Sequence, residues 1–138
     1  MVAVRVVDSS LLIEADHRGV LGALQGYLRS GPGAIAPPRV FEETVTEPRS
    51  LGHFEASAAR IEALFSNGTV AREEPDYSDG QVSKIVDRVR GCIAKKAGKP
   101  VHMVERADLQ IVALAVSHAK NRDPVELVFR DKALKDCL

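Results

Sequence analysis

Short runs of β-branched residues alternate with helical patterns along this chain, and that alternation constrains its fold more than any other feature. Residues 2–7 read Val-Ala-Val-Arg-Val-Val, a nearly continuous apolar run that is typical of a strand covered on both faces. Further short strands are predicted at Ala34–Ala36, Thr69–Arg72 and Val125–Phe129. Because strands that alternate with helices build parallel sheets, the pattern predicts an α/β sandwich.

Helices are predicted between these strands wherever apolar residues recur at helical spacing. The segment 106–119 is apolar almost all round, which predicts a largely buried helix. Phe54 is assigned to the apolar face of the helix predicted over 53–66. Asp131–Cys137 should add one or two closing helical turns. The remaining helices are expected after Asp8, near Val20–Leu28, from Pro37-Pro38 through Val45, over 53–66 and over Gln81–Gly98.

The length of 138 residues predicts a single domain over residues 1–138. No run approaches the roughly 20 apolar residues that span a bilayer, so no membrane partner is expected. Arg5 and Asp8 interrupt any signal-peptide pattern, which predicts a cytoplasmic protein. Cys92 and Cys137 form no C-x-x-C pair, and two reduced thiols are expected.

The zero net charge of the chain conceals an asymmetry. Residues 1–80 hold seven Lys and Arg against twelve Asp and Glu, whereas residues 81–138 hold twelve against seven. On the helix predicted over 81–98, four cations fall within about 60° of one another when each residue advances about 100°. This stripe is either a solvated face or a surface for a polyanion, and it consists of Lys84, Arg88, Lys95 and Lys99.

Four carboxylates are expected near the C-terminal edge of the sheet, where open parallel sheets bind their ligands. Asp8 follows the first strand, Glu43 lies in the helix after the second, Asp108 opens the buried helix and Asp131 follows the last strand. Crowded carboxylates repel one another, and a divalent cation relieves this repulsion. Oxygen ligands without Cys or His favour Mg²⁺ or Mn²⁺, which can activate water for displacement at phosphorus.

Each of these acids also has a plain alternative. Asp8 and Asp131 could be helix N-caps, and Asp108 could complement the positive end of its helix. Glu43 could be a solvated helix residue like its neighbour Glu42.

The order of these motifs resembles the PIN-domain family of nucleases. The resemblance covers nearly the whole chain and is carried by four stretches: Val6-Val7-Asp8-Ser9-Ser10, Pro38-Arg39-Val40-Phe41-Glu42-Glu43, Ala107-Asp108-Leu109-Gln110-Ile111-Val112 and Leu127-Val128-Phe129-Arg130-Asp131.

The resemblance implies a PIN-like three-layer α/β/α sandwich with a short parallel sheet of four strands, or five with a last edge strand. It also implies a Mg²⁺- or Mn²⁺-dependent endoribonuclease acting on single-stranded RNA. Asp8, Glu43, Asp108 and Asp131 would hold the metal, and Ser10 would orient water or a ligand. Arg130 stands where the family usually has serine or threonine, which makes Asp131 the least secure ligand.

Other interpretations stay open at this point. A PIN-like domain without activity would serve as an RNA- or protein-binding adaptor. A receiver or haloacid-type phosphatase also places Asp after its first strand, but the phosphatase expects Asp-x-Asp and Ser10 stands in the third position. The family includes toxin nucleases, which have antitoxin partners, and nucleases that mature ribosomal RNA, and the sequence does not choose between them. Because PIN-like domains commonly pair through helices, a homodimer is a further expectation. The helix surface considered for that homodimer comprises Leu21, Leu24, Leu28 and Phe54.

Overall fold

A four-stranded parallel sheet forms the centre of the computed structural model, in the order β3-β2-β1-β4. The structure describes residues 4–31, 33–52, 54–104, 106–121, 124–128 and 135–138. The strands are β1 (Val4–Val7), β2 (Ala34–Ala36), β3 (Val70–Arg72) and β4 (Val125–Val128).

β1 lies inside the sheet, between β2 and β4. Its residue Val6 is in register with Ile35 on one side and Leu127 on the other, and both Val6 and Val7 are fully buried. β1 and β4 are therefore neighbours although they lie far apart in the sequence. The carboxyl ends of β1 and β4 therefore meet at one edge of the sheet.

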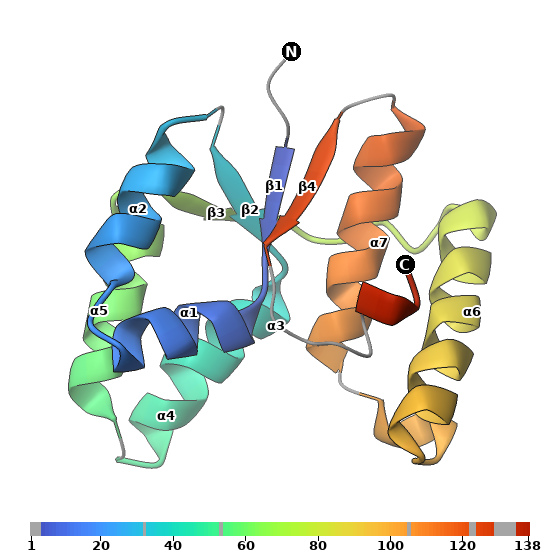
Figure 1. Ribbon diagram of the computed structural model, residues 1–138, viewed down its shortest axis with the longest axis horizontal. Coiled ribbons are helices and arrows are strands. Elements are labelled where there is room, and N and C mark those ends of the chain that lie inside the picture. Colours follow the sequence, from blue (N-terminus) through green and yellow to red (C-terminus); the bar gives the residue numbers. More distant parts are fainter. Residues whose placement is uncertain (1–3, 32, 53, 105, 122–123, 129–134) are drawn as a thin grey trace.

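Helices cover both faces of the sheet, which gives the predicted three-layer α/β/α sandwich (Figure 1). α1, α2, α4 and α5 lie on one side, and α6 and α7 lie on the other. The helices are α1 (Ser9–His17), α2 (Leu21–Arg29), α3 (Pro38–Phe41), α4 (Glu47–Ser50), α5 (Glu55–Ser66), α6 (Gly80–Ala97) and α7 (Arg106–Lys120), with a short 3₁₀ turn at Val101–Met103.

α7 is buried because it packs against two partners. One row of its side chains, including Ile111 and Leu114, joins the core formed with the sheet. A second row, including Leu109 and Val112, packs against α6. Burial on both sides explains why this segment is apolar almost all round.

One helix expected after Pro37-Pro38 is interrupted. Pro38 opens α3 at its first position, as predicted, but a π-turn at Glu42–Thr46 separates α3 from α4. Single π-turns inside helices occur frequently at functional sites, and this one carries Glu43. Sequence periodicity did not predict it.

Phe54 is the clearest error in the predicted core. It was assigned to the apolar face of the helix over 53–66, but its side chain is 77% exposed and its φ is 56°, in the left-handed region. α5 begins only at Glu55, and Leu64 is buried beside Ala58 and Ile61 instead. The predicted face of the helix is confirmed for Ala58 and Ile61, but α5 begins after Phe54 and therefore does not bury it.

This exposure bears on the homodimer, which stays a prediction. Leu28 is fully buried, and Leu21 and Leu24 pack against the main core. Of the four residues considered for the homodimer, Phe54 is the exposed one. In the described part of the chain, no helix combines the length and hydrophobicity that a membrane crossing requires.

The prediction of two reduced thiols is wrong. Cys92 on α6 and Cys137 near the C-terminus form a disulfide across 45 residues of sequence. Cys137 also packs against the α6–α7 core. The bond joins residues near the C-terminus to α6. It was not predicted because the two cysteines form no known spacing motif.

We predict that this disulfide stabilises the fold. Closing a loop of this length in the unfolded chain is worth about 2–4 kcal/mol in the free energy of unfolding. Reductant should therefore lower the urea midpoint of the wild-type protein. The double variant Cys92→Ser/Cys137→Ser should have the lower midpoint with or without reductant, and equal midpoints for all samples would contradict the prediction.

Candidate active site

Asp8 lies at the carboxyl edge of the sheet, directly after β1. Its backbone N–H donates to the carbonyl of Val128 at 3.0 Å, so it stands beside the end of β4. Only 3% of Asp8 is exposed. Its carboxylate accepts from the hydroxyl of Ser10 at 2.5 Å and from that of Ser9 at 3.5 Å.

The N-cap alternative for Asp8 is right about its position but not about its hydrogen bonds. Asp8 occupies the N-cap position of α1, but its side chain makes no capping hydrogen bond to the helix. In the part of the chain that the structure describes, no cation pairs with it. A buried carboxylate without a cationic partner is costly, and such a site is suited to a cation from solution.

Glu43 is joined to Asp8 through Ser9. The Ser9 hydroxyl lies 2.8 Å from Oε2 of Glu43, to which it donates, and the same hydroxyl reaches Asp8. The other oxygen of Glu43 lies 3.3 Å from Nε of Arg39. Glu43 is half-buried and held at both oxygens, so it is not the freely solvated residue of the plain alternative.

Arg39 connects three carboxylates on this side of the site. Its Nη1 donates to Glu42 at 3.0 Å and to Glu47 at 2.5 Å, while Nε pairs with Glu43. Hydrogen bonds to Glu42 and then Glu47 raise the pKa of the Arg39 guanidinium. Its Nε is buried without a hydrogen bond of good geometry, so the contact with Glu43 is an ion pair only.

The first turns of α7 are hydrogen-bonded to α3, the helix that carries Arg39. The backbone N–H of Arg39 donates to Oε1 of Gln110 at 3.2 Å. Gln110 lies two residues after Asp108, which occupies the first turn of α7 and is 7% exposed. Asp108 therefore lies at the positive end of the α7 dipole.

The structure thus brings part of the predicted site together. Asp8 and Glu43 share Ser9, and Asp108 stands on a helix hydrogen-bonded to α3. Asp131 lies outside the described residues. Within the described ranges, no three carboxylate, imidazole or thiolate groups are placed to hold one metal ion. A shared site for all four acids stays a prediction.

Two residues at this site were not singled out from the sequence. Ser9 was passed over in favour of Ser10, although both hydroxyls reach Asp8. Arg39 could have been found, because glutamates three and four residues later lie beside it on a helix. The donor atoms around Asp8 and Glu43 are carboxylate and hydroxyl oxygens, which fit a hard cation such as Mg²⁺ or Mn²⁺.

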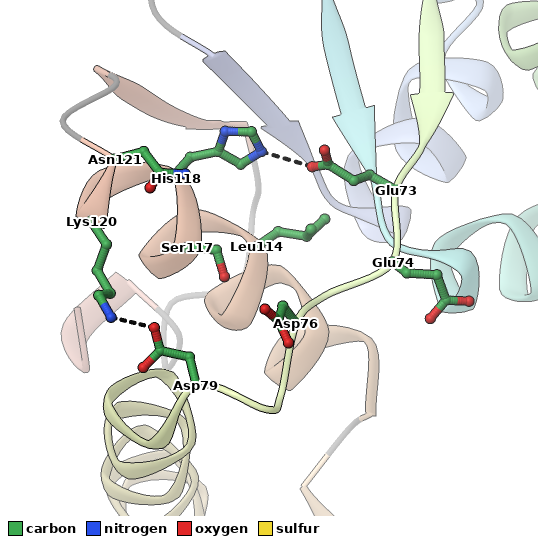
Figure 2. Close-up of a pocket in the computed structure, with 9 residues that line it drawn as sticks. All are labelled: Glu73, Glu74, Asp76, Asp79, Leu114, Ser117, His118, Lys120 and Asn121. Carbon is green, nitrogen blue, oxygen red and sulfur yellow. Dashed lines mark hydrogen bonds and ion pairs between the residues drawn. The ribbon is translucent and has the colours of Figure 1, made fainter.

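A polar pocket of about 310 Å³ lies at the other end of α7 and contains none of the predicted site residues (Figure 2). His118 contacts Glu73 at 2.7 Å, and Lys120 donates to Asp79. The hydrogen bond from Lys120 lowers the pKa of Asp79. His118 is therefore a half-buried helix residue that pairs with Glu73, and Lys120 forms an ion pair with Asp79.

The cation stripe on α6 forms as predicted. Lys84, Arg88 and Lys95 are exposed, and Lys99 follows the helix. These four pair with no carboxylate among the residues that the structure describes. On the opposite layer Arg18, Arg49 and Arg60 pair with the carboxylates Glu14, Glu62 and Asp16, whereas Arg29 donates to the hydroxyl of Thr69 and the carbonyl of Asn67. α6 thus carries three exposed cations of the stripe that have no carboxylate partner among the described residues.

A family model described as the halobacterial PIN domain matches residues 1–138, the whole chain. A search of curated proteins and a search of solved structures found no match. PIN domains are generally nucleases and typically use divalent metals, which supports a hydrolase at the level of the family. Because the family model matches residues 1–138 and the sheet is parallel, this chain belongs to the PIN-domain family.

Proposed function

We propose that the protein is a Mg²⁺- or Mn²⁺-dependent endoribonuclease that hydrolyses single-stranded RNA. Asp8, Glu43, Asp108 and Asp131 are the proposed metal ligands. The observation that carries the proposal is the Asp8 carboxylate, which is buried at the carboxyl edge of the sheet and has only serine hydroxyls as described partners.

The residues around Asp8 support specific roles. Ser9 holds an oxygen of Glu43 and contacts Asp8, so it fixes the spacing of two ligands. Ser10 is exposed and donates to Asp8, which suits a residue that orients water or a phosphate oxygen. Arg39 holds the remaining oxygen of Glu43 and balances the carboxylates around it.

A divalent cation held by these carboxylates would polarise the scissile phosphate and activate water for an in-line displacement. The protein would position that cation through the hydroxyl and guanidinium contacts of its ligands. Because such contacts orient ligands, their loss typically weakens metal binding by 10- to 100-fold.

A second candidate function is an inactive RNA- or protein-binding adaptor. It is favoured by the Arg39–Glu43 pair, which already supplies a cation to one of the proposed ligands. The two functions differ in the effect of Mn²⁺ on RNA: a nuclease should cleave RNA when Mn²⁺ is added, whereas an inactive adaptor should not. An antitoxin partner and a homodimer stay predictions under either function.

The first prediction concerns metal binding. With Mn²⁺ at about 100 times its Kd, binding should add about 2.7 kcal/mol to the free energy of unfolding, and chelator should remove the gain. Asp8→Asn should lose most of this gain. Thermal unfolding with and without Mn²⁺ measures it, and Glu74→Gln, an exposed carboxylate in the polar pocket, is the control. Equal gains in wild type and Asp8→Asn would contradict the ligand role of Asp8.

The second prediction concerns cleavage. Asp8→Asn and Asp108→Asn should each lower Mn²⁺-dependent cleavage of single-stranded RNA by at least about a hundred-fold, because each removes charge that stabilises the transition state. Asp131→Asn should have a smaller effect. Glu74→Gln should retain activity. Full activity in both Asp8→Asn and Asp108→Asn would rule out the proposed nuclease site.

The third prediction concerns the cation stripe as a contact for the RNA backbone. Lys84→Ala/Arg88→Ala should weaken RNA binding and flatten its salt dependence by up to about one to two units of slope, because fewer counterions are released. Binding is measured in an Asp8→Asn background at several salt concentrations.

The matched control for this experiment is Arg18→Ala/Arg49→Ala, which removes two cations already paired with Glu14 and Glu62. Its slope should equal that of the unaltered background. A normal slope in Lys84→Ala/Arg88→Ala would mean that RNA does not contact this face of α6.

A further inference from the structure

Two adjoining hollows lie beside α6 and the first turns of α7, and both are lined by Arg90 and Leu109. The first, of about 200 Å³, also has Tyr77 and Gln110 in its lining. The second, of about 410 Å³, is completed by His102 and other residues of the turn between the two helices. We call these five residues and the two hollows the α6–α7 trough.

The trough combines an aromatic ring, an apolar floor and hydrogen-bond donors. Tyr77 is 46% exposed, whereas Leu109, in the same lining, is buried in the α6–α7 core. The Oε1 atom of Gln110 already accepts from Arg39, so its amide nitrogen is the group left to donate. Arg90 pairs with Asp87 through one nitrogen at 3.3 Å and has further N–H groups.

The charge of the trough separates it from the polar pocket at the other end of α7. Four carboxylates line that pocket, whereas no carboxylate is found among the described residues that line either hollow of the trough. Lys95 and Lys96 are exposed on the same half of α6 as Arg90. The surroundings therefore suit an anionic chain that carries flat, partly apolar groups.

A continuous set of contacts joins the trough to the candidate active site. Gln110 accepts from the backbone of Arg39, the Arg39 guanidinium pairs with Glu43, and Glu43 accepts from Ser9 beside Asp8. Gln110 thus belongs both to the lining of the trough and to the contacts that lead to Glu43 and Asp8.

We infer that the α6–α7 trough binds an unpaired nucleobase of single-stranded RNA, with Tyr77 as its stacking platform. This inference rests on the proposed function and names the part of the substrate that is recognised. Single-stranded nucleic acids are held by aromatic stacking together with positive charge along the backbone. The free N–H groups of Gln110 and Arg90 donate to acceptors on the base edge or to a flanking phosphate.

The trough also predicts a preference for single strands. The bases of a duplex remain stacked and paired, so they cannot enter a side pocket without being flipped out. A duplex of the same length should therefore bind through its charge alone and leave Tyr77 unaffected.

The aromatic content of the chain makes this inference directly measurable. The protein has no tryptophan and two tyrosines, Tyr27 and Tyr77. In a Tyr27→Phe variant, Tyr77 is the sole tyrosine emitter. A single-stranded oligoribonucleotide added in the presence of chelator, so that no cleavage occurs, should quench its emission. An abasic oligonucleotide of equal length and charge should not.

Affinity provides a second measurement. Tyr77→Ala should weaken binding of the same oligoribonucleotide by roughly five- to 150-fold, the range found when a stacked aromatic is removed. Tyr77→Phe keeps the ring and should bind within about two-fold of the wild type. The quenching measurement keeps Tyr77 in place, so it decides the question even where Tyr77→Ala folds poorly.

The outcomes separate this inference from the proposed function. Unchanged affinity in folded Tyr77→Ala, or equal quenching by the abasic oligonucleotide, would overturn the trough even where the wild type cleaves RNA with Mn²⁺. Base-dependent quenching would support the trough even where no metal produces cleavage, and the adaptor would then be the better function.

Discussion

The burial of α7 between the sheet and α6 is the constraint on which the rest of the structure depends. Ile111 and Leu114 fill the core with the sheet, while Leu109 and Val112 fill the core with α6. A helix buried on both sides cannot rotate or slide without opening cavities, because protein interiors are close-packed. The first turn of α7 is thereby fixed in position, and with it Asp108 and Gln110.

The other side of the site depends on a different constraint. Asp8 is placed by strand pairing, since its own backbone continues the contact between β1 and β4. Glu43 is placed by the π-turn and by contacts to Ser9 and Arg39. The hydrogen bond from Arg39 to Gln110 then links the two sides. Strand pairing, helix burial and one partly exposed ionic network therefore meet at the carboxyl edge of the sheet.

The fold could be predicted because each strand and helix carries its own local signal. Ala34–Ala36 and β2 coincide, Pro38 begins α3, and Gly98 ends α6 in the left-handed conformation. Periodicity fails where the backbone departs from a regular helix. It missed the π-turn around Glu43, and it assigned Phe54 to a helix that begins one residue later.

Only those residues of the site whose positions follow from the end of a strand or the start of a helix could be predicted from the sequence. Asp8 and Asp108 follow from their places after a strand and at a helix start. The roles of Ser9 and Arg39 depend on side-chain directions that no spacing rule gives, since Ser9 and Ser10 are equally plausible from the sequence. The Cys92–Cys137 bond joins residues 45 apart in the sequence. Because their spacing matches no known motif, it does not indicate whether the two thiols are bonded or reduced.

The asymmetry of charge along the sequence becomes an asymmetry between layers. On the layer of α1 and α5, cations such as Arg49 and Arg60 are matched by the nearby carboxylates Glu62 and Asp16, so their fields largely cancel beyond a Debye length. Lys84, Arg88 and Lys95 on α6 have no such partners in the described structure, so their fields extend into solvent. A zero net charge therefore does not exclude a polyanion as a ligand. These three cations stand on the helix packed against α7, the helix that carries Asp108.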